Sequence, residues 1–387
     1  MANIVTTDGS KTLYTYIAEA AAAPGVAPTA GAHKTLRSNF GVKFDLKRDT
    51  FMSKERRSDR MEGALSFGNK SGSGSIPVEW SYGSFDDLIE AVLGGTWASE
   101  VLKIGNTNRT FMFEETATEL GIVEQQLGVQ FSGLSISQKV NGIAEGSIDF
   151  IFRNIHGPQT KGVNLAYDSS AKTITRSSAG FITVDGWALG DYVCGQGNTD
   201  AGNNNATPWV ITTLTDTVMT FTTATGITTK VATAGIVLNN ASRATEVTAA
   251  STQPAFDSFT GTITEGGAVI AHVTGWDLKV EQTVQPNFAN GSDSPVSTSV
   301  GTIKVSGNLT VYYIDQALRK KFINGTASSL SLVLGSVAAT KAYTLALGTV
   351  KYTSNTRDDA ELARTESMSF AATYTATDTT LKITRTP

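Results

Sequence analysis

The sequence predicts a mainly β protein with two tandem copies of one sandwich- or barrel-like unit, each with one short helix, separated by a small all-β domain. Three observations predict this fold. Thr, Ser, Ala, Gly and Asn are abundant whereas 17% of the residues are charged, a composition typical of many short strands joined by tight turns. Short segments alternate apolar and polar residues, as half-buried strands do. Several of these segments return in the same order near the C-terminus.

The length of 387 residues exceeds the usual size of one domain. We expect an N-terminal arm over 1–35, a first repeat over 36–160, an Ig-like or small-barrel β domain over 161–254 and a second repeat over 255–387. The arm is rich in Ala, Gly and Pro, and residues 16–23 are compatible with a short helix that Pro24 ends. The folded chain is therefore expected to begin near Leu36.

In the first repeat, alternation predicts strands at residues 44–47, 76–82, 129–136 and 148–152. Gly133 is expected to mark a bulge. A helix is predicted over 84–93, because Ser84 can cap it, Asp86 and Asp87 follow at its positive end, and Gly94 can end it.

The second repeat echoes this order. Residues 44–47 (FDLK) return as 276–279 (WDLK), and residues 147–150 (SIDF) return as 367–370 (SMSF). Between them, residues 303–313 alternate as a strand, and a helix over 314–323 ends at Asn-Gly-Thr where the first ends at Gly-Gly-Thr. Matches that recur in one order predict two homologous units.

The segment between the repeats has few charges and little helix signal. Strands are predicted at residues 181–184, 187–193, 209–211 and 218–221, with a loop over 198–206 and a last apolar segment over 232–238. We expect this domain on the exterior of the main body.

These residues resemble siphophage major tail tube proteins. The resemblance is carried by GSIPVEWSY at 74–82, GSFDDLIEAVLGGTW at 83–97 and LTVYYIDQALRKKFINGTASSL at 309–330. It implies β-sandwich subunits that self-associate into rings, stacked as a tube around a lumen that conducts viral DNA. Implied partners are the tape measure protein in the lumen and the tail terminator and tail tip proteins at the ends. Six single-fold subunits close such a ring, so two folds per chain favour a trimer with pseudo-sixfold symmetry, with a hexamer as the alternative.

Two sets of residues are candidates for this function. The long charged segment 46–74 is expected to be a loop that folds against the next ring, where Lys54, Arg56, Arg57 and Arg60 would pair with carboxylates. Its counterpart, 283–300, is nearly uncharged, and a solvated loop face is the alternative interpretation. Neutral or acidic side chains are expected along the lumen, so that phosphates slide without binding. Candidates are Glu79, Asp149, Asp277 and Glu281, for which simple exposure to solvent is the alternative.

The sequence indicates neither an enzyme nor a cofactor or metal site. Its three histidines lack metal-ligand spacing, Cys194 stands alone, and the Gly-rich residues 71–75 lack the lysine of a phosphate loop and read as a flexible loop. The net charge of −4 disfavours a general nucleic-acid-binding surface. No signal peptide or membrane-spanning run is visible, so we expect a virion tail protein assembled in the bacterial host cytoplasm.

Two other classes stay open. The middle domain could make the chain a surface adhesin or carbohydrate-binding module, with Trp187 and Trp209 stacking on sugars, although burial is the commoner fate of a strand tryptophan. A tube subunit of a contractile or secretion apparatus shares the fold but usually lacks the duplication.

Overall fold

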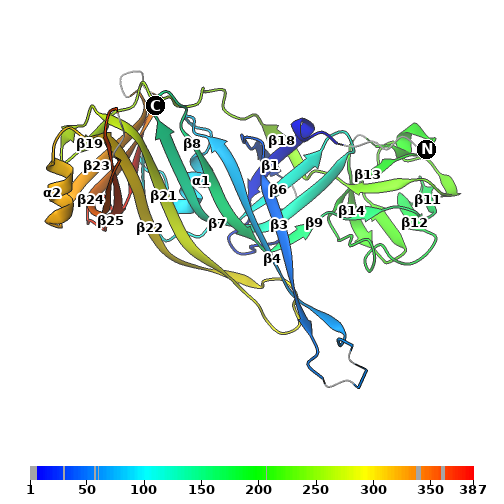
Figure 1. Ribbon diagram of the computed structural model, residues 1–387. Coiled ribbons are helices and arrows are strands. Elements are labelled where there is room, and N and C mark those ends of the chain that lie inside the picture. The colour runs from blue at the N-terminus through cyan, green and yellow to red at the C-terminus, as the bar shows by residue number, and fades with distance from the viewer. Residues whose placement is uncertain are drawn as a thin grey trace. The chain divides into compact units, whose positions relative to one another are not determined.

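A computed structural model of the chain describes residues 7–28, 31–55, 58–59, 61–205, 207–336, 341–358 and 362–387, with Thr245 as backbone only. The chain forms two compact units (Figure 1). Unit 1 comprises Met1–Leu36, Phe111–Gly128 and Asn154–Ala249, and unit 2 comprises Arg37–Thr110, Val129–Arg153 and Ala250–Pro387. The mainly β class is confirmed, since strands far outnumber the two α-helices of the described residues. The four predicted segments remain a prediction, and the contacts group the chain differently.

One antiparallel sheet dominates unit 2. Its strands lie side by side in the order β3 (Lys43–Met52), β4 (Leu65–Glu79), β8 (Glu145–Phe152), β7 (Ile122–Lys139, of which 129–139 belong to this unit), β21 (Val273–Asn287), β22 (Ser297–Tyr312), β25 (Thr365–Ala372) and β24 (Lys341–Arg357). The two hairpins β3–β4 and β21–β22 extend beyond the body of the unit (Figure 1).

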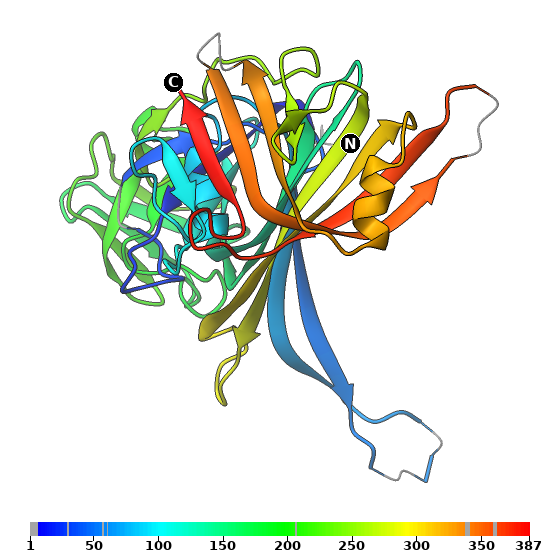
Figure 2. The ribbon, with the colours of Figure 1, turned by 90° about the vertical axis from the view of Figure 1, so that its left-hand side faces the viewer.

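A second layer covers one face of this sheet. It contains the first half of β24 with β23 (Ser328–Ser336), β26 (Lys382–Thr386), β5 (Val101–Lys103), β19 (Ile263–Glu265) and β20 (Ala268–Val269). Figure 2 shows β26, in red at the C-terminus, beside the orange β24. Apolar side chains from both layers fill the space between them, among them Leu134 and Leu278 of the main sheet and Leu345 of the second layer, each at most 3% exposed.

The two helices are α1 (Asp86–Leu93) and α2 (Ala317–Ile323). Both confirm predicted helices, and Gly94 ends α1 in the left-handed region at φ +60°, as expected of a C-terminal glycine. The predicted Ser84 cap is wrong: the N-cap position is Phe85, and the Ser84 hydroxyl pairs with that of Ser81 at 2.5 Å.

Unit 1 contains two groups of strands. The first is built from β1 (Thr12–Ala18), β2 (Gly31–Thr35), β6 (Phe111–Ala117), β9 (Asn154–His156), β18 (Ala244–Thr248) and the start of β7, with a 3-10 turn at Gly9–Lys11. The second is an eight-stranded sheet in the order β10 (Gln159–Thr160), β17 (Val237–Asn240), β13 (Tyr192–Gln196), β14 (Trp209–Leu214), β15 (Val218–Phe221), β12 (Thr173–Arg176), β11 (Leu165–Asp168) and β16 (Lys230–Thr233). A 3-10 turn lies at Ala201–Asn203.

Several expectations of local structure are wrong. Residues 16–23 form no helix, because β1 pairs with β6 from Thr12 onward, so the folded chain begins well before Leu36. Residues 181–184 are a turn that Asp216 holds through its carboxylate, and residues 187–191 precede a strand that starts at Tyr192. The segment 46–74 is a hairpin for most of its length, and residues 71–75 lie within β4.

Candidate functional site: a polar sheet face and two open strand edges

The main sheet of unit 2 has one apolar and one polar face. Its inward side chains are buried in the core, namely Ile76, Val78, Leu134, Ile136, Ile148, Phe150, Leu278, Val280, Val305, Leu309, Met368 and Phe370. The residues between them alternate to the other side. We call this side the polar face, which consists of Ser75, Glu79, Ser135, Ser137, Glu145, Ser147, Asp149, Asp277, Lys279, Glu281, Lys304, Ser306, Asn308, Ser367 and Ser369. Serines and carboxylates dominate it.

The structure brings all four predicted acidic candidates onto the polar face. Glu79 lies on β4, Asp149 on β8, and Asp277 and Glu281 on β21. Sequence reasoning missed Glu145, which lies directly opposite Glu79 in the pairing of β4 with β8.

Hydrogen bonds tie some of these carboxylates to the sheet. The Ser75 hydroxyl donates to Oδ1 of Asp149 at 2.6 Å. Lys279 Nζ lies 2.6 Å from Oε1 of Glu281, and this hydrogen bond raises the pKa of Lys279. Partial desolvation raises the pKa of Asp277. The Lys279–Glu281 pair is about half exposed, so it contributes little to stability, but it neutralises one of the lysines on this face.

The sheet ends in two open strand edges. Within the described residues, β3 pairs with β4 alone, and residues 351–357 of β24 pair with β25 alone. Each strand therefore presents backbone N–H and C=O groups without a strand partner on its outer side. Such edges are templates for pairing with another chain.

The strand order repeats within this one sheet. The series β3-β4-β8-β7 is followed directly by β21-β22-β25-β24, and a helix follows the second strand of each series in the chain. Gly74 pairs with Phe150 in the first series, and Gly307 pairs with Phe370 in the second. A bulge interrupts β7 between Phe131 and Gly133, as predicted for Gly133.

Hydrogen-bond registers correct one detail of the sequence comparison. Gly74 lies opposite Phe44, whereas Gly307 lies opposite Leu278. If the two glycines are equivalent, Phe44 corresponds to Leu278, and the echo of FDLK by WDLK is offset by two residues. The better match joins residues 74–80 (GSIPVEW) with residues 307–313 (GNLTVYY).

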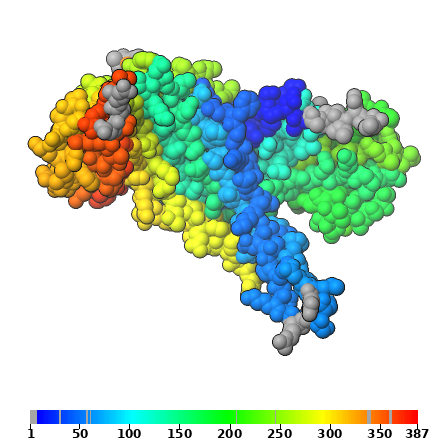
Figure 3. All heavy atoms as spheres, viewed as in Figure 1, coloured from blue at the N-terminus to red at the C-terminus, as the bar shows by residue number. Residues whose placement is uncertain are grey.

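The β3–β4 hairpin is exposed on both faces at its outer end. Figure 3 shows it, in blue, reaching beyond the yellow β21–β22 hairpin. Asp293, at the tip of the β21–β22 hairpin, contacts the β3–β4 hairpin. Its Oδ2 lies 2.6 Å from Nζ of Lys70 and 3.5 Å from Nη2 of Arg48. Lys54 is exposed in the connection between β3 and β4, while the predicted Arg56, Arg57 and Arg60 lie outside the described residues. Sequence reasoning missed the exposed apolar side chains of this hairpin, Leu46, Phe51, Met52, Leu65 and Phe67.

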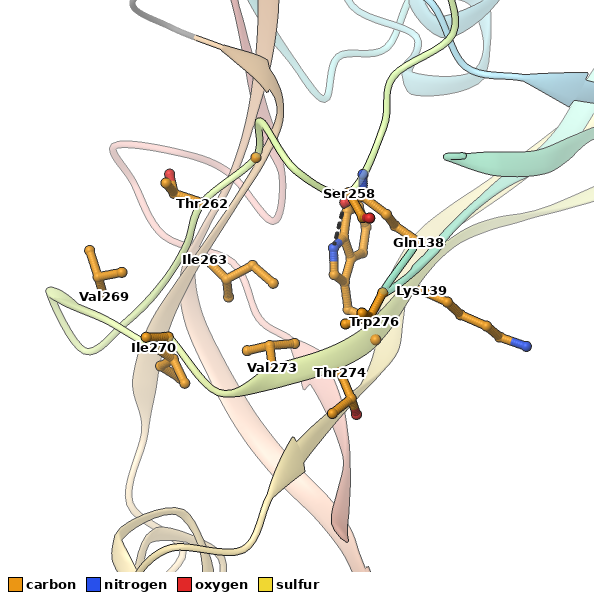
Figure 4. Close-up of a pocket in the computed structure, with 14 residues that line it drawn as sticks. Gln138, Lys139, Ser258, Thr262, Ile263, Val269, Ile270, Val273, Thr274 and Trp276 are labelled. Atoms are coloured by element: carbon orange, nitrogen blue, oxygen red, sulfur yellow. Dashed lines mark hydrogen bonds between the residues drawn. The ribbon is translucent and has the colours of Figure 1, made fainter. Parts of the chain in front are cut away.

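A cavity of about 260 Å³ lies beside Trp276, between β21 and the β19–β20 segment (Figure 4). Gln138 crosses one side of it: Trp276 Nε1 donates to its Oε1 at 3.1 Å, and its Nε2 donates to the Asp257 carbonyl at 2.6 Å. Both ends of this amide are thus satisfied. Lys139 is the one titratable side chain among the lining residues, so the cavity offers no acid–base pair.

The other candidate chemistry lies in unit 1. Trp187 and Trp209 are each 2% exposed in the core of the eight-stranded sheet, so neither offers a face for stacking on a sugar. Burial raises the pKa of the Cys194 thiol to about 11, which disfavours a reactive thiolate. Among the described residues, no cluster of His, Cys, Asp and Glu could hold a metal ion. None of the described helices is long and apolar enough to cross a membrane.

A family model described as "Phage tail tube protein" matches residues 9–385 of the chain. This match spans both series of strands and the eight-stranded sheet between them. A search of curated proteins found no match.

Proposed function

This chain belongs to the phage tail tube protein family, and we propose that it is the structural subunit of a siphophage tail tube, polymerising as stacked rings around a lumen for DNA. The observation that carries the proposal is the main sheet of unit 2, which has a polar face on one side, a core on the other and an open strand at each end. A sheet of this kind can continue from chain to chain until it closes, because cyclic closure satisfies both edges.

The repeated strand order supports three chains in each ring. Each chain supplies two series of four strands in one sheet, so three chains supply six series and a pseudo-sixfold ring. A ring of six chains is the alternative.

The polar face would line the lumen. Its serines and carboxylates present no cluster of cations to phosphates, so DNA passes without being held. Glu79, Asp149, Asp277 and Glu281 would contribute the negative charge, together with Glu145.

The β3–β4 hairpin would contact the next ring through Lys54, Arg56, Arg57 and Arg60 and through the exposed apolar side chains near its tip, Phe51, Met52, Leu65 and Phe67. Exposed apolar patches on otherwise polar proteins mark sites of association. The eight-stranded domain would lie on the tube exterior, the tape measure protein would share the lumen with DNA, and terminator and tip proteins would bind the two ends. The subunit would act without catalysis and would assemble in the host cytoplasm.

Negative-stain electron microscopy of the purified protein tests this function. Rings or tubes with a central channel are expected, and class averages viewed along the axis would distinguish three chains from six. Persistent monomers at assembly concentrations, above all monomers that bind glycans, would overturn the proposal in favour of an adhesin.

A further inference from the structure

We infer that neighbouring copies join through residues 354–357 of β24 with the adjoining Asp358, and through residues 43–47 of β3, in the register of the β7–β21 junction inside each chain. The inference rests on the proposed ring-forming function and adds its partner surface: a second copy of this chain, paired antiparallel, with named residues opposite one another.

The internal junction supplies the template. There the last strand of the first series pairs with the first strand of the second, with Ser137 opposite Asp277, Ser135 opposite Lys279 and Gly133 opposite Glu281. If copies of the chain continue the same sheet, the last strand of one chain, β24, meets the first strand of the next, β3. These are the two strands with open outer edges.

Strand pairings fix which residues of β24 and β7 are equivalent. Phe131 lies opposite Phe150, and Tyr352 lies opposite Phe370. A bulge follows at the same place in both strands, between Phe131 and Gly133 and between Tyr352 and Ser354. Ser354 in β24 is therefore structurally equivalent to Gly133 in β7, and Thr356 is equivalent to Ser135.

The pairing with the glycines fixes the other strand. Leu278 lies opposite Gly307 as Phe44 lies opposite Gly74, so Asp45 takes the place of Lys279. By the same count, Lys47 takes the place of Glu281. The junction between copies then places Thr356 opposite Asp45, Ser354 opposite Lys47, and Asp358 opposite Lys43.

The faces of the strands agree with this register. Lys43 and Asp45 lie opposite Ser75 and Ser73, on the polar side of the sheet. Phe44 turns to the apolar side, where its ring packs 5.4 Å from that of Phe150. A shift of the pairing by one residue would move every side chain of the strand to the opposite face of the sheet, so the observed faces constrain the register. The charges agree as well, because Asp358 and Lys43 have opposite signs.

Exposure of one apolar residue points to a missing neighbour. Leu46 is equivalent to Val280, which is fully buried in the core, with β7 paired along its strand. In the single chain, Leu46 is 49% exposed on the apolar side of an open edge. A second copy paired along β3 would place Asn355 beside Leu46, as β7 places Leu134 beside Val280, and would reduce the exposure of Leu46.

Paired cysteines test the register. In a Cys194→Ser background, Asp45→Cys with Thr356→Cys should give disulfide-linked oligomers that end at the closed ring on non-reducing gels. Mixing the two single variants should give covalent dimers. Ser135→Cys with Lys279→Cys is the matched positive control, because the same geometry lies within one chain. Lys43→Cys with Ser354→Cys, four residues out of register along the strand, should not cross-link.

The outcomes separate this inference from the function on which it rests. Rings that form but cross-link only through another pair overturn the register and leave the tube function intact. Absence of rings and of cross-links overturns both. As a second measurement, Lys43→Glu and Asp358→Lys should each lower the yield of rings, and the double variant should restore it. Failure of the double variant to restore rings contradicts the Asp358–Lys43 pair.

Discussion

Gly307 packs so closely against Phe370 that a Cβ on the glycine would lie 2.6 Å from Cζ of the ring. The backbone carbonyl oxygen of Asp277 would lie closer still to the same Cβ. Gly307→Ala should therefore lower the free energy of unfolding by about 1–3 kcal/mol through overpacking. Gly74→Ala should cost a similar amount, because Gly74 meets Phe150 in the same way. Chemical denaturation measures both, and Gly9→Ala, with open space around it, is the control. An unchanged midpoint for Gly307→Ala would contradict the close contact.

The buried pair His33–Glu114 predicts acid sensitivity in unit 1. Both side chains are fully buried, with His33 Nδ1 3.3 Å from a Glu114 oxygen. Burial alone would raise the pKa of Glu114, but hydrogen bonds with His33, Ser242 and the Arg243 backbone outweigh it and lower the pKa below its ordinary value of 4.5. A lowered pKa in the folded state stabilises the fold above that ordinary value, and the stabilisation is lost as the pH falls through the lowered pKa.

Glu114→Gln should therefore destabilise the protein by about 3 kcal/mol at pH 7, because it leaves the buried groups around it without their charged partner. It should also flatten the dependence of stability on pH below about 4.5. Urea unfolding followed by circular dichroism across pH 3–7 checks both effects. Equal acid slopes for the variant and the unchanged protein would rule out Glu114 as the titrating group.

Deleting residues 50–62 should abolish tube formation and leave the subunit folded. The outer half of the β3–β4 hairpin places no side chain in the core, and every residue of β3 from Asp45 to Met52 is exposed. Circular dichroism checks the fold, and electron microscopy checks the tubes. Lys54→Ala, which keeps the hairpin, is a milder control. Tubes of ordinary length from the deletion variant would remove the hairpin from the contact between rings.

Charge reversal on the polar face should make the tube retain DNA. Asp277→Lys with Glu281→Lys adds cations beside Lys279 and leaves the core untouched, so assembly should proceed while DNA bound by the tubes rises at low salt and falls steeply with added salt. Asp277→Asn with Glu281→Gln, which adds no cation, should change much less. A filter-binding titration measures this, and equal DNA retention by all three proteins would argue against a lumenal polar face.

Sequence patterns were informative where packing is local. Helix α1 could be predicted because acidic residues begin it, an apolar face runs along it and Gly94 ends it. The strands around Phe150 and Leu309 could be predicted because one face of each is buried, which produces the alternation. The four acidic candidates could be placed on the polar face for the same reason.

The failures have two physical causes, the absence of a buried face and dependence on partners that are distant in sequence. The β3–β4 hairpin buries neither face at its outer end, so its sequence carries no alternation and resembles a charged loop. The turn at residues 181–184 depends on Asp216, more than thirty residues away, which accepts from the backbone N–H groups of Ile182 and Thr183. From the sequence alone, the apolar residues of 181–184 have the pattern of a strand, because the pattern does not show the contact with Asp216. The register of the two series likewise depends on pairing between strands, and the FDLK echo alone misplaced it by two residues.

Because one polypeptide carries two series of strands, the fold affects both the spacing of surface features around a ring and the kinetics of ring closure. In a trimer, a feature that only one series carries, such as the long β3–β4 hairpin or the eight-stranded insertion, recurs at every second position around the axis. Half of the junctions between successive series form within a chain as it folds, so their formation does not depend on protein concentration. Closure of such a trimer requires three molecules to meet instead of six, so its rate should depend less steeply on protein concentration than that of a ring built from single-fold subunits.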